Sequence, residues 1–176
     1  TGEADAMVTG HSRSYPSTIK PVMQLIDKAP GVSKIATTNM MMTARGPIFL
    51  SDTAINPNPS ADDLARIALM TAKTVRMFGM EPVIAMVSYS NFGSSNNEGP
   101  SKVSQAVAYL HENFPDLIVD GEIQTDFALN SEMLKSKFPF SKLVNKKVNT
   151  LIFPNLDAAN ITYKLLKELN KAESIG

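Results

Sequence analysis

Apolar and polar residues alternate in blocks along the chain, and each block predicts a strand or a helix. Short apolar runs at residues 83–87 and 148–153 are typical of strands that are buried on both faces. Between such runs, apolar residues recur at helical spacing, for example from Leu64 to Phe78. This alternation predicts an α/β fold with a mostly parallel sheet covered by helices on both faces.

Local signals set the boundaries of the remaining elements. Residues 44–46 predict a hairpin turn between two extended runs, and Ser60 predicts the cap of a helix that Gly79 ends. Another helix is expected to be capped by Ser17 or Thr18, with Pro21 close to its start. The expected strands are residues 4–10, 34–43, 47–51, 83–87, 117–119 and 148–153, and the expected helices are residues 17–26, 60–78, from 100 onward, around 127–134, and 158–170.

The loop after the strand at residues 83–87 is rich in hydroxyl groups. Four serines and an asparagine surround Gly93 between residues 88 and 95, and Pro100 marks the start of the next helix. A buried strand, a polar loop and a helix start can together hold a phosphate or a carboxylate. Taken by itself, the loop fits a simple chain turn better, and both interpretations stay open.

Three carboxylates follow the strand that is expected to end at Val119. One interpretation makes Asp120 or Glu122 a general base that Asp126 orients. In the other, which the residues alone favour, Asp120 turns the chain and Asp126 supports the start of the next helix. Lysines between residues 135 and 147 are interpreted as a solvated face rather than a phosphate site.

Composition narrows the function classes. The chain has 176 residues, of which 43% are hydrophobic, and this fits one soluble globular domain with a core, or one domain plus a fragment. The formal net charge is zero, which argues against a nucleic-acid partner. No apolar run reaches the ~20 residues that span a bilayer, so no membrane partner is expected. Cysteine is absent, which excludes thiolate chemistry, and we expect a cytoplasmic protein.

Familiar catalytic and cofactor patterns are missing from the sequence. The two histidines, His11 and His111, lie far apart without metal-binding spacing, and His111 is expected on a helix surface. Neither a G-x-S-x-G motif nor a dinucleotide or Walker pattern occurs. We therefore predict no metal site. Both ends of the chain run into expected secondary structure, which suggests a fragment of a longer protein.

Four segments share their order and spacing with one enzyme family. They are residues 4–10 (ADAMVTG), 86–94 (MVSYSNFGS), 120–126 (DGEIQTD) and 153–164 (FPNLDAANITYK). Along nearly its whole length the chain resembles the phosphate acetyltransferase (phosphotransacetylase) family, which converts acetyl-CoA and phosphate to acetyl phosphate and CoA. The resemblance implies a three-layer αβα sandwich with a mostly parallel mixed sheet, like that of isocitrate and isopropylmalate dehydrogenases. It also implies a homodimer or a higher homo-oligomer.

Two loops depart from the enzymes of that family. Family enzymes typically have Ser-Thr-Lys-Gly-Ser where this chain has residues 90–94 (SNFGS), so a positive charge is lost, and residues 157–160 (DAAN) replace Glu-Ala-Gly-Asn. Both loops are more similar to the phosphotransacetylase-like domain at the C-terminus of large bacterial NADP-dependent malic enzymes, which convert malate to pyruvate and CO2. The family's catalytic Ser-Arg pair and aspartate would lie beyond residue 176, so the resemblance assigns no catalytic residue here.

The resemblance implies that residues 1–176 form a phosphotransacetylase-like regulatory and oligomerisation domain that binds acetyl-CoA or a related acyl-CoA as an effector. The NADP and divalent-metal sites of such a malic enzyme would lie in its N-terminal part. An active phosphate acetyltransferase is the alternative, and a purely structural dimerisation unit is the third hypothesis. Ser94 and Asn160 are expected to face one hollow. The full set of expected ligand contacts is Arg13, Ser90, Asn91, Gly93, Ser94, Asp126, Asn155 and Asn160.

Overall fold

The computed structural model describes residues 15–28, 32, 34–169 and 174–175, which fall into two compact units, residues 1–33 and residues 34–176. In the first unit, helix α1 (Tyr15–Leu25) confirms the predicted helix but begins earlier than expected. Pro21 therefore lies inside α1 rather than near its start. The strand predicted at residues 4–10 lies outside the described residues, as does His11.

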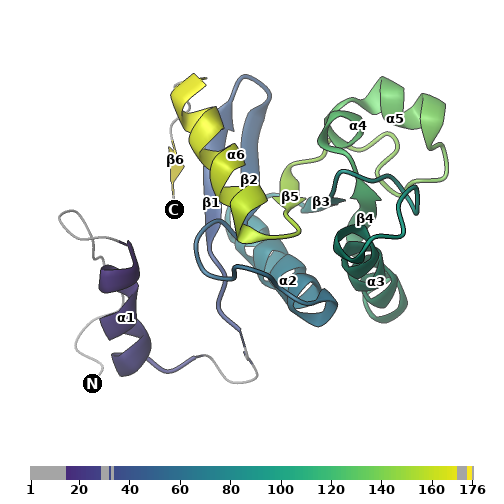
Figure 1. The fold of residues 1–176 in the computed structure, drawn as a ribbon. Helices are drawn as coiled ribbons and strands as arrows, with labels where there is room; N and C mark the ends of the chain where they lie inside the picture. The colour runs from purple at the N-terminus through teal and green to yellow at the C-terminus, as the bar shows by residue number, and fades with distance from the viewer. Residues whose placement is uncertain (1–14, 29–31, 33, 170–173, 176) are drawn as a thin grey trace. The chain divides into compact units, whose positions relative to one another are not determined.

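A six-stranded mixed sheet forms the centre of the second unit (Figure 1). Its strands are β1 (Thr38–Thr43), β2 (Gly46–Ser51), β3 (Val83–Val87), β4 (Ile118–Ile123), β5 (Thr150–Ile152) and β6 (Ser174–Ile175), in the spatial order β4-β3-β5-β2-β1-β6. The four strands from β4 to β2 are parallel, whereas β1 is antiparallel to both β2 and β6. The predicted mostly parallel sheet with one added hairpin is confirmed.

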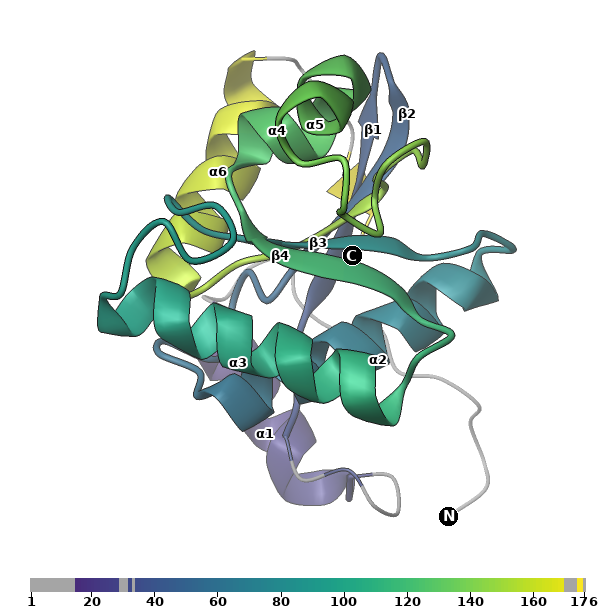
Figure 2. The ribbon, with the colours of Figure 1, turned by 90° about the vertical axis from the view of Figure 1, so that its right-hand side faces the viewer.

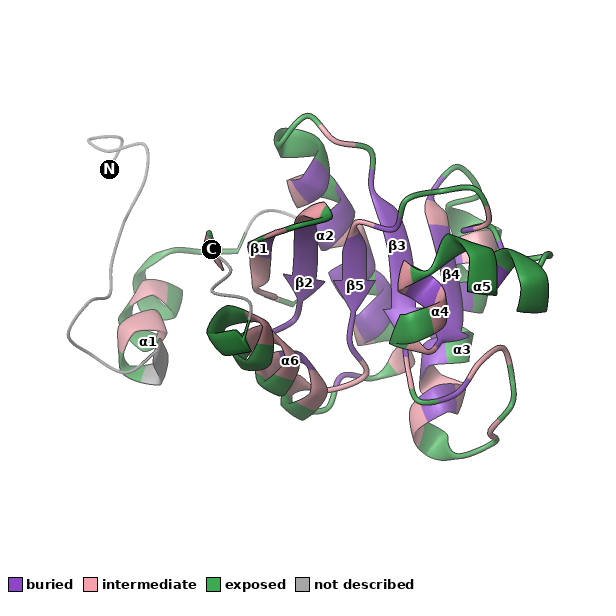
Figure 3. Ribbon diagram, turned by 90° about the horizontal axis from the view of Figure 1, so that it is seen from above, coloured by how far each residue is buried: buried purple, intermediate pink, exposed green. Residues whose placement is uncertain are grey.

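Helices cover both faces of this sheet, as Figure 2 shows: α2 and α3 lie on one side, and α4, α5 and α6 lie on the other. Alternation along β3 explains the layers, because Ile84 and Met86 pack with the α2–α3 side while Ala85 and Val87 pack with the other side. The strands are buried throughout their centre (Figure 3). The helices are α2 (Ala61–Met77), α3 (Glu98–Asn113), α4 (Thr125–Leu129), α5 (Ser131–Lys137) and α6 (Leu156–Leu169).

Several helix boundaries follow from local capping. Ser60 caps α2 as predicted: its hydroxyl accepts from the Asp63 N–H at 3.2 Å, and the Asp63 carboxylate accepts from the Ser60 N–H. The single helix expected around residues 127–134 is instead two short helices. Asn130 separates them because its side chain accepts from the Met133 N–H at 3.1 Å and so caps α5.

Strand β4 continues well past the predicted end at Val119. It pairs with β3 as far as Ile123, so Asp120 and Glu122 lie within the strand, and both are buried. The interpretation in which Asp120 turns the chain is therefore wrong. Its carboxylate accepts from the Ser141 hydroxyl and the Lys142 N–H, both at 2.8 Å, and these hydrogen bonds offset the cost of its burial.

His111 is also placed differently from the expected helix surface. Its ring is half-buried, and Nε2 lies 2.8 Å from the Val119 carbonyl oxygen and 3.8 Å from an Asp120 carboxylate oxygen. Over the described ranges, no group of three or more histidine, cysteine, aspartate or glutamate side chains is arranged to hold a metal ion. None of the helices in those ranges is both long enough and apolar enough to cross a membrane.

Candidate functional site

The carboxyl ends of the parallel strands bring four connecting segments to one edge of the sheet. Residues 52–56 follow β2, residues 88–97 follow β3, Gln124 follows β4, and residues 153–155 follow β5. Ligands of parallel α/β sheets bind at this edge, because loops and helix N-termini meet there. The polar loop after β3 is the longest of the four segments.

The loop at residues 88–97 is fixed to the end of β4. The Ser88 N–H donates to the Ile123 carbonyl at 3.0 Å, and the Phe92 N–H donates to the Glu122 carbonyl at 2.8 Å. The register between β3 and β4 shifts at this point, where Met86 faces Gly121 but Val87 faces Ile123, so Glu122 is an extra residue in β4. The bulge brings the Glu122 side chain under the loop.

The Glu122 carboxylate organises the polar groups of this loop. Oε1 accepts from the Gly93 N–H at 2.6 Å and from the Ser90 hydroxyl at 3.0 Å, and the Ser90 and Ser94 hydroxyls are 2.9 Å apart. Gly93 has a φ of 86°, a backbone conformation that favours glycine. Glu122 is 1% exposed, and its second oxygen, Oε2, has no hydrogen-bond partner among the described residues.

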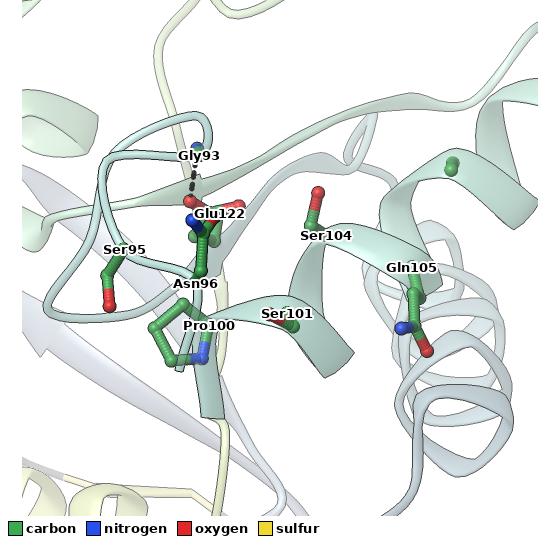
Figure 4. A pocket seen from close by; sticks show the side chains of 9 residues that line it. Gly93, Ser95, Asn96, Pro100, Ser101, Ser104, Gln105 and Glu122 are labelled. Atoms are coloured by element: carbon green, nitrogen blue, oxygen red, sulfur yellow. Dashed lines mark hydrogen bonds between the residues drawn. The ribbon is translucent and has the colours of Figure 1, made fainter. Parts of the chain in front are cut away.

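A pocket of about 310 Å³ lies between this loop and one side of α3, with Glu122 in its wall; we call it the Glu122 pocket. Figure 4 shows the Glu122 carboxylate between Gly93 and Ser104. Apart from Glu122, every lining residue is uncharged. The pocket is lined by Gly93, Ser95, Asn96, Pro100, Ser101, Ser104, Gln105, Ala108 and Glu122.

A second pocket, of about 210 Å³, lies between the ends of β3 and β5 and the start of α3; we call it the Lys102 pocket. The Lys102 ammonium donates to Asn58 Oδ1 at 2.6 Å. Partial burial lowers the pKa of Lys102 below its ordinary 10.5, although the nearby Glu98 carboxylate acts in the opposite direction. Its lining residues are Asn58, Ser88, Tyr89, Glu98, Gly99, Lys102, Pro154 and Asn155.

Four of the predicted ligand residues lie together in the loop. Gly93 lines the Glu122 pocket and Ser90 is buried. Ser94 is an exposed residue whose hydroxyl accepts from the Asn91 N–H at 3.0 Å. The Asn91 side-chain oxygen accepts from the Gln124 N–H at 2.8 Å. These polar groups therefore hold the loop in shape, whether or not a ligand also touches them.

The other predicted residues are dispersed. Asn155 lines the Lys102 pocket and caps α6 through the Ala158 N–H at 2.9 Å, whereas Asp126 is exposed in the first turn of α4. The Asn160 side chain donates to the Thr53 carbonyl at 3.1 Å. Neither of the two pockets includes Ser94 or Asn160, so their shared hollow stays a prediction. Arg13 lies outside the described residues.

The sequence analysis did not predict that residues of helix α3 line the Lys102 pocket. Glu98 and Lys102 both line the Lys102 pocket. They are four residues apart at the start of a helix that directly follows the polar loop, and this spacing places them on one side of the helix. That spacing was visible in the sequence and could have identified them.

Comparisons with known proteins give a consistent match over the whole chain. The profile of the phosphate acetyl/butaryl transferase family matches residues 1–176. The chain is 38% identical over 175 residues to an NADP-dependent malic enzyme of Haemophilus influenzae, covering 99% of this chain and 23% of that protein. It is 40% identical over 182 residues to a phosphate acetyltransferase of Acetivibrio thermocellus, covering 99% of this chain and 54% of that protein.

Solved structures give the same result. A phosphotransacetylase from Streptococcus pyogenes superposes with a TM-score of 0.89 at 36% identity, covering 99% of this chain and 54% of the other. The EutD phosphotransacetylase from Staphylococcus aureus gives a TM-score of 0.82 at 34% identity, covering 90% of this chain and 49% of the other. The chain thus spans about half the length of the phosphate acetyltransferase and about a quarter of the malic enzyme.

Proposed function

Because the chain belongs to the phosphate acetyl/butaryl transferase family, we propose that it binds acetyl-CoA, or a related acyl-CoA, as the effector of an NADP-dependent decarboxylating malic enzyme. Phosphotransacetylase-like domains occur both in malic enzymes and in phosphate acetyltransferases, and identities of 38% and 40% do not separate the two groups. The choice between them therefore depends on the chemistry of the site.

The observation that carries the proposal is the Lys102 pocket. It lies at the carboxyl edge of the parallel strands, where the hydroxyl of Ser88 and the amide of Asn155 lie near an ammonium group. Ammonium, hydroxyl and amide groups are the donors that phosphate oxygens need. Coenzyme A carries a pyrophosphate and a further phosphate, so its phosphate oxygens can accept from these donors, although Glu98 adds a negative charge to the same pocket.

Phe92 supports binding rather than acetyl transfer. It stands where family enzymes typically have lysine, and its ring centroid lies 5.0 Å from that of Phe138 and 5.0 Å from that of Phe140. The side chain is thus part of an aromatic cluster and supplies no charge to a phosphate. A regulatory domain needs only to bind the coenzyme, whereas an acetyltransferase must also stabilise charge that develops on the transferred group.

Calorimetric titration of the chain with acetyl-CoA tests the proposal. Lys102→Met should weaken binding about tenfold, because one charge-assisted hydrogen bond to phosphate is lost. Glu98→Gln should tighten binding, because it removes a negative charge from the same pocket. Lys73→Met, which changes an exposed lysine on α2, is the matched control and should leave the affinity unchanged. Equal affinity for acetyl-CoA and for an unrelated nucleotide such as GTP would refute the proposal.

An active phosphate acetyltransferase is the second candidate, favoured by the TM-score of 0.89 to the Streptococcus pyogenes phosphotransacetylase. Formation of the acetyl-CoA thioester from CoA and acetyl phosphate by the complete protein would favour it. We also propose that the domain self-associates as a homodimer or a higher homo-oligomer, which sedimentation velocity measures. Self-association without any effect of acyl-CoA on the melting temperature would leave only an architectural role.

A further inference from the structure

Only one of the two oxygens of the Glu122 carboxylate accepts hydrogen bonds from the described residues. Oε1 accepts two hydrogen bonds from the loop, whereas Oε2 has no partner among the described residues, although Glu122 is only 1% exposed. A buried carboxylate oxygen without a donor carries a large desolvation cost. Since Glu122 lines the Glu122 pocket, a donor that enters this pocket can remove that cost.

The charge of the pocket defines what kind of donor fits. Glu122 is its one charged lining residue, and neither lysine nor arginine faces it from the loop or from α3. The negative charge therefore has no protein counter-charge within the pocket, and a phosphate or carboxylate ligand would be repelled. The Lys102 pocket differs, because a lysine, Lys102, lines it together with Glu98.

The volume of the Glu122 pocket and its lining residues further restrict the kind of ligand that fits. About 310 Å³ is within the range of small-molecule sites and is too large for a single ion. Ser104 and Gln105 on α3 and Asn96 on the loop add neutral hydrogen-bonding groups, while Pro100 and Ala108 add apolar surface. Because Glu122 is almost fully buried, the group that reaches it has to be compact, as a primary ammonium group is.

We propose that the Glu122 pocket binds a small organic molecule with a primary ammonium group, and that the N–H groups of this ammonium donate hydrogen bonds to Glu122 Oε2. The aliphatic part of the molecule lies against Pro100 and Ala108, and its polar substituents meet Ser104 and Gln105. This site is separate from the one proposed for acyl-CoA.

The test is a nuclear magnetic resonance titration of the chain with three probes. Butylammonium combines a positive charge with N–H donors, tetraethylammonium has the charge without donors, and butyramide has donors without the charge. Butylammonium should shift the amide signals of Gly93 and Ser104 saturably, and the other two probes should bind at least about tenfold more weakly. Equal shifts from butyramide and butylammonium would overturn the proposal, because the charge would then not matter.

Two variants test the pocket itself. Glu122→Gln keeps an oxygen for the Gly93 and Ser90 donors but removes the charge, and it should weaken butylammonium binding about tenfold or more. Ser104→Phe changes an exposed residue, leaves the Glu122 hydrogen bonds intact and fills the pocket, so it should abolish binding. Glu112→Gln, an exposed charge change on the same helix, is the control and should bind like the wild type.

Two results would refute the assignment. One is equal butylammonium affinity in the Glu122→Gln and Glu112→Gln variants. The other concerns a lysine side chain from a second copy of the chain, which has the same chemistry. If the wild type self-associates and Ser104→Phe makes it monomeric in sedimentation velocity, the occupant is that side chain and not a small molecule.

Discussion

Replacing Asp52 by asparagine should strongly destabilise the second unit. Asp52 directly follows β2 and is 5% exposed, and its carboxylate accepts six hydrogen bonds. Four of the donors reach Oδ1, from Thr37, Ala54 and Ile55. The other two, the N–H and side-chain amide of Asn56, reach Oδ2 at 2.8 and 2.6 Å.

The expected loss of stability follows from the number of hydrogen-bond donors around Asp52. An asparagine can keep its carbonyl oxygen toward the four donors, but its NH2 group then faces the two donors of Asn56. Each of these two buried donors costs about 1–3 kcal/mol when it is left without an acceptor, so the free energy of unfolding should fall by about 2–6 kcal/mol. With a urea dependence of about 2 kcal/mol per molar, the midpoint of unfolding should fall by about 1–3 M.

Urea unfolding followed by circular dichroism measures this shift. Asp116→Asn, a matched change at an exposed position, should leave the midpoint nearly unchanged. A fall of less than about 0.5 M for Asp52→Asn, with an unchanged slope, would show that the six hydrogen bonds do not stabilise the fold as argued.

Acid should reproduce part of the same effect. Burial alone would raise the pKa of Asp52, but hydrogen bonds from Thr37, Ala54 and Asn56 outweigh it and hold the pKa below 3.8. The folded protein therefore binds this proton more weakly than the unfolded chain does. The stability from Asp52 is complete above about pH 4 and is lost as the pH falls below 3.8 through the folded pKa. Asp52→Asn should lack this contribution to the pH dependence.

Two further changes test the packing that positions the site. Ser60→Ala removes the capping box of α2 and should lower stability by about 1 kcal/mol, or the melting temperature by about 2–4 °C in calorimetry. Gly121→Ala would place a Cβ 2.4 Å from the Met86 carbonyl oxygen at a φ of 146°, and should cost about 2–4 kcal/mol in urea unfolding. Gly99→Ala, where a Cβ meets nothing within 4 Å, is its control and should leave stability nearly unchanged.

Elements whose signals lie close together in the sequence were predicted correctly. Ser60 and Asp63, three residues apart, contain the whole capping box of α2. The turn between β1 and β2 needs only the residues around Gly46, and the hairpin forms there as predicted. In both cases the hydrogen-bonding partners are neighbours in the chain, so a short window of sequence contains the physical cause.

The end of β4 could not be predicted in this way. Asp120 and Glu122 are acidic residues, which are depleted in strands, so the sequence suggests that the strand stops before them. Their burial depends on donors that are distant in the chain: Ser141 for Asp120, and Ser90 with Gly93 for Glu122. No local window shows that these donors arrive, and this is why the carboxylates were interpreted as loop residues.

The polar loop after β3 is a poor guide to ligand contacts, because most of its polar groups already form hydrogen bonds within the protein. In the loop, the polar groups of Ser90, Asn91 and Gly93 already bond to Glu122 or to Gln124. The groups that line both pockets include residues of α3, which the sequence indicates only as helix surface. Hydroxyl-rich loops at sheet edges therefore have to satisfy their own backbone and any buried charge beneath them before they can bind a ligand. In this domain the buried charge beneath the loop is Glu122, and its second oxygen, rather than the number of serines above it, is the group to which we propose that a ligand binds.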